Sequence, residues 1–178
     1  MKNYLITGAA GFIGAAFAKK LISLGHCVVT IDNLTTGKES NIPDGVLFIK
    51  GDCGDPGSFS KIPNKKFDAI VHIAGQSSGE ISFDDPVYDI TTNTISTLLL
   101  LDFAMQHDCD RFIYAGTMSV YGAQPDRPVK EDAKCNPTSF YGIGKLASEH
   151  YMKIYRAYGM KTTSLRLFNV YGPGQNLD

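Results

Sequence analysis

A tyrosine and a lysine four positions apart are the residues of this sequence best suited to chemistry. Tyr141 and Lys145 belong to the run Tyr-Gly-Ile-Gly-Lys, and on a helix they would share one face, separated by one turn of roughly 6 Å. A fixed ammonium favours the phenolate, so it should lower the pKa of Tyr141 from its ordinary value of about 10. Tyr141 would then be a usable general base near neutral pH. The alternative is an ordinary surface pair.

Thr117 favours the catalytic interpretation over the surface pair. It follows the apolar run of residues 111–115, a predicted strand, within the segment Ala-Gly-Thr-Met-Ser-Val-Tyr-Gly. A hydroxyl just beyond a strand end could hydrogen-bond the same substrate oxygen that Tyr141 deprotonates. The three side chains together predict a site for proton removal from an alcohol.

A glycine-rich turn near the start of the chain predicts a phosphate site. Residues 4–6 are apolar and partly β-branched, like a buried strand, and apolar residues recur at helical spacing from residue 12 onward. A helix that begins there directs unpaired N–H groups and its positive dipole end at the turn. Gly8 would permit the sharp turn, Gly11 would admit a diphosphate, and Gly14 would allow close packing. The alternative is a tight turn that binds nothing.

Two aspartates extend this site toward a dinucleotide. Asp32 lies 21 residues after Gly11, at the end of the predicted strand 27–31. A carboxylate there accepts both ribose hydroxyls of an adenosine and repels a 2′-phosphate, and no basic residue follows before Lys38, which favours NAD over NADP. Asp52 follows the predicted strand 46–49 and could accept from the adenine amino group. Each could instead be an ordinary strand-end or turn aspartate.

The remaining elements complete an α/β pattern. Further strands are predicted over residues 69–73 and 162–167, and long helices over residues 86–107 and 139–158. Strands that alternate with helices predict a doubly wound parallel sheet with helices on both faces, here as a single domain over residues 1–178. Ligands bind such sheets beyond the carboxyl ends of the strands. The glycine turn, Asp32, Asp52, Gln76 and Thr117 all follow strand ends.

Composition and charge exclude several classes of protein. A net charge of -1 without a basic patch argues against nucleic-acid binding. The sequence has no apolar run long enough for a membrane span and no signal peptide. Cys27, Cys53, Cys109 and Cys135 form no C-x-x-C pair, so we expect reduced thiols in a cytoplasmic protein. The histidines are scattered and show no metal-ligand spacing, so no metal is expected.

Together these segments resemble the extended short-chain dehydrogenase/reductase superfamily, and within it the NAD-dependent nucleotide-sugar epimerase/dehydratase family. The resemblance implies a Rossmann-type fold and runs from one end of the chain to the other. It is carried by residues 7–14, Asp32, residues 51–52, residues 72–76, Asn93, residues 119–122, Tyr141 with Lys145, and residues 166–174.

The resemblance implies a role for each matching residue. Catalysis would depend on Thr117, Tyr141 and Lys145. The nucleotide-sugar substrate would contact Gln76, Thr117 and Asn169. The cofactor NAD would contact Gly8, Gly11, Phe12, Ile13, Gly14, Asp32, Asn33, Asp52, Cys53, Ala74, Gly75, Gln76, Asn93, Tyr141 and Lys145. The implied reaction is an epimerisation, in which NAD oxidises a sugar hydroxyl and the hydride returns to the other face of the keto-sugar.

Departures from the family pattern leave alternatives open. Dehydratases of the family usually carry Asp-Glu after the catalytic threonine, whereas this chain has Met118 and Ser119, so dehydration is not expected. A nucleotide-sugar reductase or decarboxylase remains an alternative. A regulator that binds NAD without catalysis is another, although the intact catalytic residues disfavour it.

The length of the chain and its two long helices lead to expectations about a missing domain and a dimer partner. Family members are considerably longer, and their C-terminal part supplies most substrate contacts, so we expect the cofactor-binding portion with the C-terminal substrate domain largely missing. The helices 86–107 and 139–158 resemble the pair that forms the dimer interface in this family. Residues 98–101, all leucine, are apolar around more of the helix than one core face requires. We therefore expect a homodimer, although burial against the sheet alone would also explain these leucines.

Overall fold

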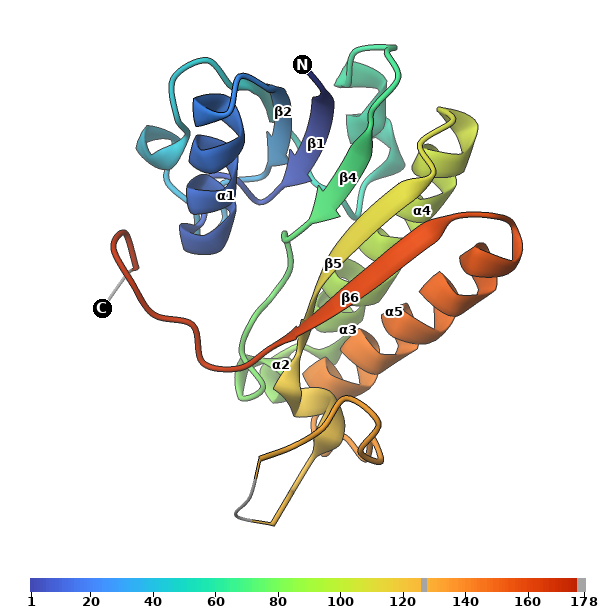
Figure 1. Ribbon diagram of the computed structural model, residues 1–178. Coiled ribbons are helices and arrows are strands. Elements are labelled where there is room, and N and C mark those ends of the chain that lie inside the picture. Colours follow the sequence, from blue (N-terminus) through green and yellow to red (C-terminus); the bar gives the residue numbers. More distant parts are fainter. Residues whose placement is uncertain (126–127, 176–178) are drawn as a thin grey trace.

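Six parallel strands form one sheet in the order β3-β2-β1-β4-β5-β6 (Figure 1). The computed structural model describes residues 1–125 and 128–175. The strands are β1 (Asn3–Thr7), β2 (Cys27–Asp32), β3 (Leu47–Lys50), β4 (Ala69–His72), β5 (Arg111–Thr117) and β6 (Lys161–Leu167). All six match the predicted segments to within two residues at each end; β5 extends furthest past its prediction, by two residues to Thr117.

Helices cover both faces of this sheet. They are α1 (Phe12–Ser23), α2 (Ile81–Asp84), α3 (Pro86–Ile90), α4 (Ser96–Gln106) and α5 (Phe140–Ala157), with 3-10 turns η1 (Glu39–Asn41), η2 (Pro56–Lys61) and η4 (Met118–Tyr121) and a π-helical turn η3 (Thr91–Ile95). One core contains Leu5 and Ile70 with Leu100 and Met152 of α4 and α5, and the other contains Ile6 with residues of α1. Because both faces are covered, the central strands are largely apolar.

The strand order reverses at β1. This strand pairs with β2 on one side and with β4 on the other, so the loops after β1 and β4 leave the sheet next to each other. Such a switch point opens a crevice at the carboxyl ends of the strands. The expected doubly wound Rossmann-type sheet is confirmed.

The predicted helix 86–107 is not one regular helix. Its first turn begins at Pro86 and is capped by Asp85, whose side chain accepts from the N–H of Tyr88. The helix then widens into the π turn η3 before α4 begins. Hydroxyls of Thr91, Thr92, Ser96 and Thr97 donate to carbonyls four residues earlier. These bonds compete with the backbone ladder, which explains why the sequence pattern missed the interruption.

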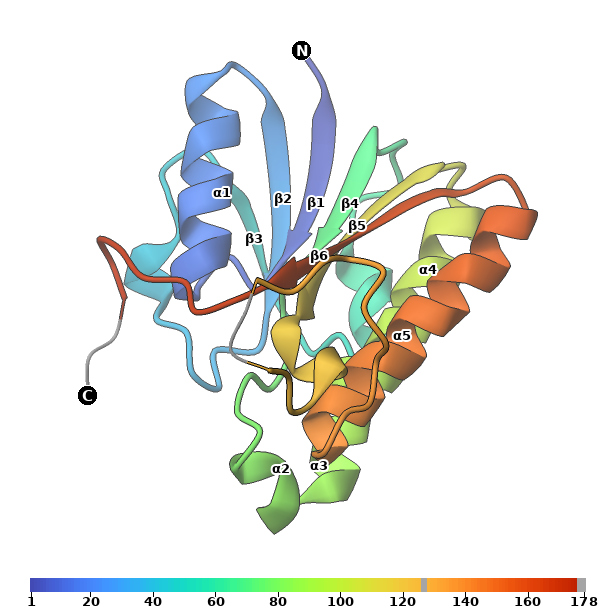
Figure 2. The same cartoon turned by 60° about the horizontal axis from the view of Figure 1, so that its bottom comes forward.

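The segment after β6 returns across the molecule. Figure 2 shows it passing from β6 toward α1, where a methyl group on Gly172 would lie 3.6 Å from the ring of Phe12. Residues 169–175 form neither helix nor strand, as predicted, and the rest of that predicted irregular segment, to residue 178, lies outside the described residues. Within residues 1–125 and 128–175, no helix combines the length and the apolar character that crossing a bilayer requires.

Candidate active site

A groove of about 530 Å³ runs along the carboxyl ends of β3, β2, β1 and β4. This volume lies within the range of small-molecule sites. Twelve of the fifteen residues expected to contact the cofactor line it: Gly8, Gly11, Phe12, Ile13, Gly14, Asp32, Asn33, Asp52, Cys53, Ala74, Gly75 and Gln76. The exceptions are Asn93, Tyr141 and Lys145, of which Asn93 and Lys145 lie beside the groove at Gly75. A methyl group on Gly75 would come within 2.4 Å of Asn93 Oδ1 and 3.5 Å of Lys145 Nζ.

The glycine turn has the geometry that its spacing predicts. Gly8 has a φ of +80°, which favours glycine. A methyl group on Gly14 would lie 2.1 Å from the carbonyl oxygen of Gly8, whereas one on Gly11 would lie at an ordinary 3.4 Å from the same oxygen. Helix α1 begins with no side-chain cap and no acidic residue in its first turn. Its first N–H groups and positive dipole end therefore remain available to an anion in the groove.

Asp32 is held rigidly in the wall of the groove. Its Oδ2 accepts from the N–H of Ala10 at 3.0 Å and its Oδ1 accepts from the N–H of Leu34 at 2.9 Å, and the residue is 8% exposed. Each carboxylate oxygen has a second lone pair for a ligand. The side chain is thus fixed before any hydroxyl approaches it.

Asp52 lies next to Asp32 along the edge of the sheet. Its Oδ2 accepts from Asn33 Nδ2 at 2.8 Å and its Oδ1 accepts from the N–H of Gly54 at 2.7 Å. The neighbouring thiol of Cys53 is buried, and burial, followed by the charges of Asp52 and Asp32, raises its pKa. Cys53 is therefore an unreactive wall residue.

Tyr141, Lys145 and Thr117 come together where β5 ends against α5. Tyr141 is 8% exposed and Lys145 4%. Lys145 Nζ donates to the carbonyl oxygen of Ala115 at 3.1 Å and lies 5.8 Å from the ring centre of Tyr141. Thr117 is the last residue of β5, and its hydroxyl donates to Ser119 Oγ at 3.2 Å and accepts from the N–H of Ser119 at 3.1 Å. The helical spacing and the strand end thus bring these side chains together.

The predicted direction of the Tyr141 pKa shift is wrong for this structure. Burial raises the pKa of Tyr141; the hydroxyl of Thr117 acts against this rise, and the charge of Asp89 adds to it. Burial also lowers the pKa of Lys145 to about 8, against the opposing effect of Asp89. Desolvation is thus the largest cause of both shifts, and Lys145 Nζ donates its hydrogen bond to the carbonyl oxygen of Ala115.

Asp89 is a buried carboxylate close to these residues, and the sequence did not mark it as a site residue. Asp89, 1% exposed, accepts at Oδ1 from Asn93 Nδ2 and from Gln76 Nε2, both at 3.0 Å. Burial raises the pKa of Asp89, whereas Asn93, Lys145 and Gln76 act to lower it. The four-residue spacing from Asp89 to Asn93 within a predicted helix was the signal in the sequence.

Gln76 and Asn93 differ in whether their amide oxygen already has a hydrogen-bond partner. Gln76 donates to the carbonyl oxygen of Ser78 at 2.6 Å and accepts from the N–H of Ser78, so its amide shapes its own loop. Asn93 Oδ1 is buried and has no hydrogen-bond partner among the described residues. Such an acceptor costs free energy unless a donor reaches it, and it faces Gly75 in the wall of the groove.

His72 secures the switch point as a neutral side chain. Burial and then the charge of Lys145 lower its pKa to about 3. The hydroxyl of Thr7 accepts from the N–H groups of Ile73 and Ala74, so its proton points to His72 Nδ1 at 2.8 Å. His72 Nε2 then donates to Ser96 at 3.3 Å. This chain of bonds ties the ends of β1 and β4 to the helix that contains Asn93.

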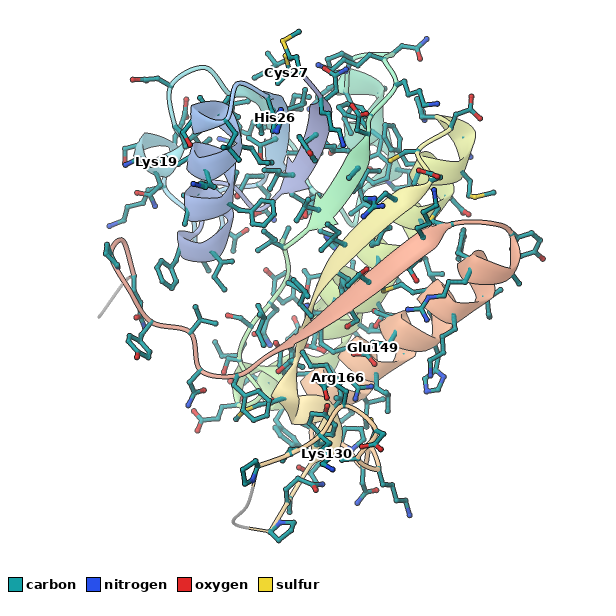
Figure 3. All side chains as sticks on the ribbon, in the orientation of Figure 1. Lys19, His26, Cys27, Lys130, Glu149 and Arg166 are labelled. Atoms are coloured by element: carbon teal, nitrogen blue, oxygen red, sulfur yellow. The ribbon has the colours of Figure 1, made fainter. Side chains whose placement is uncertain are left out.

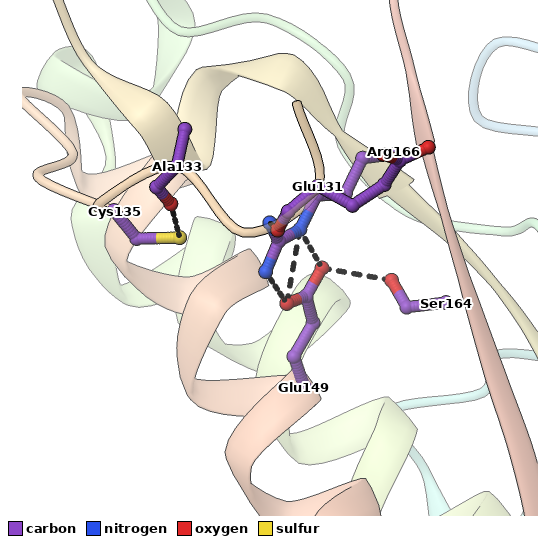
Figure 4. A network of polar contacts seen from close by, with 6 residues as sticks. All are labelled: Glu131, Ala133, Cys135, Glu149, Ser164 and Arg166. Carbon is purple, nitrogen blue, oxygen red and sulfur yellow. Dashed lines mark hydrogen bonds and ion pairs between the residues drawn. The ribbon is translucent and has the colours of Figure 1, made fainter. Parts of the chain in front are cut away.

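An ion pair holds the loop that precedes α5. Figure 3 shows Glu149 on α5 and Arg166 on β6 close together, above the loop that contains Lys130. Arg166 Nη2 lies 2.7 Å from Glu149 Oε2, and Ser164 donates to Glu149 Oε1 at 2.8 Å (Figure 4). Arg166 also donates to the carbonyl oxygen of Glu131. Burial acts to raise the pKa of Glu149, but the bonds from Arg166 and Ser164 outweigh it and hold that pKa below its ordinary value.

One predicted substrate residue is not part of this cluster. Asn169 lies two residues beyond β6 and is exposed. It does not line the groove. Thr117 and Gln76, the other two predicted substrate residues, lie at the end of β5 and in the loop after β4.

The sequence matches a known protein family along almost all of its length. Residues 4–178 match the model of the NAD dependent epimerase/dehydratase family. The UDP-glucose 4-epimerase of Mycolicibacterium smegmatis is 36% identical over 179 residues, which cover 97% of this chain and 57% of the relative. The chain therefore spans little more than half the length of such relatives.

Solved structures agree with the sequence comparison. The UDP-glucose 4-epimerase of Thermus thermophilus, in complex with NAD, superposes with a TM-score of 0.91 at 36% identity, over 98% of this chain and 57% of that one. The UDP-glucose 4-epimerase of Thermotoga maritima, with UDP-glucose, has a TM-score of 0.91 at 37% identity, over 98% and 58%.

Proposed function

Because the chain belongs to the NAD-dependent epimerase/dehydratase family of the extended short-chain dehydrogenase/reductase superfamily, we propose that it is the cofactor-binding part of a nucleotide-sugar epimerase. The observation that carries this proposal is the order of groups along the sheet. Acidic acceptors follow β3 and β2, an anion cradle follows β1, and a phenol, an ammonium and a hydroxyl lie around the ends of β4 and β5. A dinucleotide presents its parts in this order.

The residues of the groove fit NAD. Asp32 and Asp52 would hold the adenosine, with Asn33 and Cys53 beside them. The N–H groups of residues 11–14 would hold the diphosphate, where the missing side chain of Gly11 leaves room. Lys145, Tyr141 and the unpaired Oδ1 of Asn93 would meet the nicotinamide ribose. Asp32 favours NAD over NADP because its fixed carboxylate repels a 2′-phosphate.

Tyr141 would carry the proton transfer. When bound, NAD supplies the hydride acceptor. Tyr141 takes the proton of a sugar hydroxyl while the carbon of that C–O bond loses its hydrogen as hydride, which leaves a keto-sugar. Thr117 would hydrogen-bond the same oxygen, and the ammonium of Lys145 would stabilise the phenolate. Tyr141 would later return its proton to the same oxygen, and inversion would result if the keto-sugar is reduced on its opposite face.

The site gives Tyr141 a pKa that depends on what is bound. Burial raises it here, and the positive charge of an oxidised nicotinamide ring beside the phenol would act to lower it. This arrangement would keep the phenol neutral until the cofactor is seated.

UDP-glucose and related nucleotide sugars are the substrates we propose for the whole protein. Relatives named UDP-glucose 4-epimerase support this class. Met118 and Ser119 follow Thr117 where a dehydratase would need acidic side chains, which disfavours elimination of water. Net release of NADH during turnover would instead indicate the alternative, a reductase or decarboxylase of the family.

We also propose that the protein is a homodimer. The outer surfaces of the predicted interface helices carry exposed apolar residues, namely Val87, Ile90, Ile95, Ile143, Tyr151 and Ile154. Leu100 and Leu101 are buried in the core with the sheet residues, whereas Leu98 and Leu99 are half-buried. The outward apolar surface therefore supports a second role for these helices beyond covering the sheet.

The proposed compartment is the cytoplasm. The four cysteines are free thiols, two of them buried. This is the usual state of cysteines in a reducing compartment.

Calorimetric titration of this chain with NAD and with NADP tests the cofactor proposal. We expect NAD to bind, and NADP to bind at least about tenfold more weakly, because of the charge of Asp32. Equal binding of both would contradict the role of Asp32, and binding of neither would contradict the proposed function. In the full-length protein, Tyr141→Phe should lower the rate of sugar epimerisation by about 10²-fold or more.

A further inference from the structure

Asp89 is the most deeply buried carboxylate beside the groove, and nothing in the proposed reaction uses it. Both hydrogen bonds that it accepts come from side-chain amides, of Asn93 within the same helical stretch and of Gln76 in the loop after β4. Lys145 is the charged group that faces it. The carboxylate therefore connects a helix to the loop that forms one wall of the groove.

These contacts decide which way each amide points. An amide presents an oxygen on one side and an NH₂ group on the other. Asp89 Oδ1 accepts whether or not Oδ2 carries a proton, so each NH₂ group turns toward it. Asn93 must then direct its oxygen at Gly75, where that oxygen is buried and has no partner within residues 1–125 and 128–175. Gln76 directs its oxygen at the N–H of Ser78.

Asn93 Oδ1 and Gly75 lie in one half of the groove. Gly75 follows β4, beyond the switch point from Asp32 and Asp52, which follow β2 and β3. Lys145 Nζ would lie 3.5 Å from a methyl group on Gly75. The groups that Asp89 orients therefore face the end of the groove where Lys145 Nζ lies.

We infer that Asp89 is a positioning residue that orients the amides of Asn93 and Gln76, so that the groove offers an acceptor to the nicotinamide-ribose half of a dinucleotide. The inference rests on the proposed function, because it assumes a dinucleotide in this groove. A donor such as a ribose hydroxyl would pair with Asn93 Oδ1. The adenosine half would not sense Asp89.

Two substitutions separate orientation from charge. In Asp89→Asn the carboxamide oxygen can still accept from both amides, but the negative charge is lost. In Asp89→Leu the shape is similar and no acceptor remains. Each variant and the wild-type chain are titrated with NAD and with ADP, since ADP lacks the nicotinamide-ribose half.

We expect Asp89→Leu to weaken NAD binding about tenfold or more and to leave ADP binding within about twofold. Asp89→Asn should bind both ligands within about threefold of wild type. The side-chain NH₂ signals of Asn93 and Gln76 in nuclear magnetic resonance should exchange slowly with solvent in wild type and Asp89→Asn, and fast in Asp89→Leu.

Several results would overturn the inference. If Asp89→Asn loses as much NAD affinity as Asp89→Leu, the charge matters and not the orientation. If Asp89→Leu loses NAD and ADP binding together, or fails to fold, Asp89 only supports the structure. Fast exchange of the NH₂ groups of Asn93 and Gln76 in the wild-type chain would exclude the orienting role without any variant. Unaffected NAD binding in Asp89→Leu would refute the inference but not the proposed function. If the wild-type chain binds neither ligand, the proposed function itself fails.

Discussion

Burial makes the positive charge of Lys145 unfavourable for the stability of the folded chain. Burial lowers its pKa to about 8 in the folded chain, from an ordinary value of 10.5. Between these two values the unfolded chain binds more protons than the folded chain, so this residue makes the free energy of unfolding rise with pH in that window and costs most below pH 8.

Removal of the ammonium should therefore abolish one part of the pH dependence. Between pH 8 and 10.5, the free energy of unfolding of wild type should rise relative to that of Lys145→Met by on the order of 3 kcal/mol. Denaturant titrations of both proteins across this range measure the difference, which cancels the thiols and tyrosines common to both. A constant difference would show that Lys145 is not desolvated in the native state.

At the scale of single residues, the sequence predicted which side chains meet but not their electrostatics. The positions of Tyr141, Lys145 and Thr117 follow from helical spacing and from a strand end, which are local properties. The pKa of Tyr141 depends instead on burial and on Asp89, which lies 52 positions earlier in the chain. Such non-local contacts leave no spacing signal, and for the same reason the role of Asp89 itself was missed.

At the scale of elements, the turn between β1 and α1 contains glycines that are needed for two different reasons. A methyl group on Gly14 would collide with the backbone of Gly8, whereas one on Gly11 would make an ordinary contact with it. Gly14 is thus needed by the fold, and Gly11 is needed by the proposed ligand.

Alanine substitutions should show this difference. Gly14→Ala is expected to lower the free energy of unfolding by about 2 kcal/mol or more, since backbone must move. Gly11→Ala should change stability by less than about 1 kcal/mol yet weaken NAD binding at least about tenfold. Thermal unfolding and calorimetry on the two variants give both quantities. Unchanged NAD affinity in a folded Gly11→Ala protein would contradict the diphosphate cradle.

Element boundaries could be predicted where periodicity alone sets them. The central strands and the helices that begin at Phe12 and Phe140 match closely, because their apolar patterns record the two faces of the sheet. The π turn at Thr91–Ile95 could not be predicted from apolar spacing, because it depends on hydroxyl bonds to the helix backbone. That turn contains Asn93, so the miss occurred at a proposed site residue, where such turns are frequent.

At the scale of the whole molecule, the outer faces of α3 and α5 should decide the oligomeric state. Ile154 on α5 is 54% exposed, and Leu24, beyond the end of α1 on the other face of the sheet, is 55% exposed. These two residues are matched in exposure and apolar character, and only Ile154 lies on the proposed interface.

Equilibrium sedimentation should therefore find a dimer for wild type and for Leu24→Glu, and a monomer for Ile154→Glu, because a buried unpaired carboxylate would oppose association. A monomeric wild-type chain would remove the dimer proposal. A dimer that persists in Ile154→Glu would place the interface elsewhere.

A crystal structure of this chain with NAD would show whether one groove holds the dinucleotide with its reactive ring beside Tyr141. We expect the diphosphate at the start of α1, the adenosine ribose on Asp32, and the reacting carbon of the nicotinamide within roughly 4 Å of the Tyr141 hydroxyl. An ordered NAD molecule whose nicotinamide lies away from the ends of β4 and β5 would contradict this expectation.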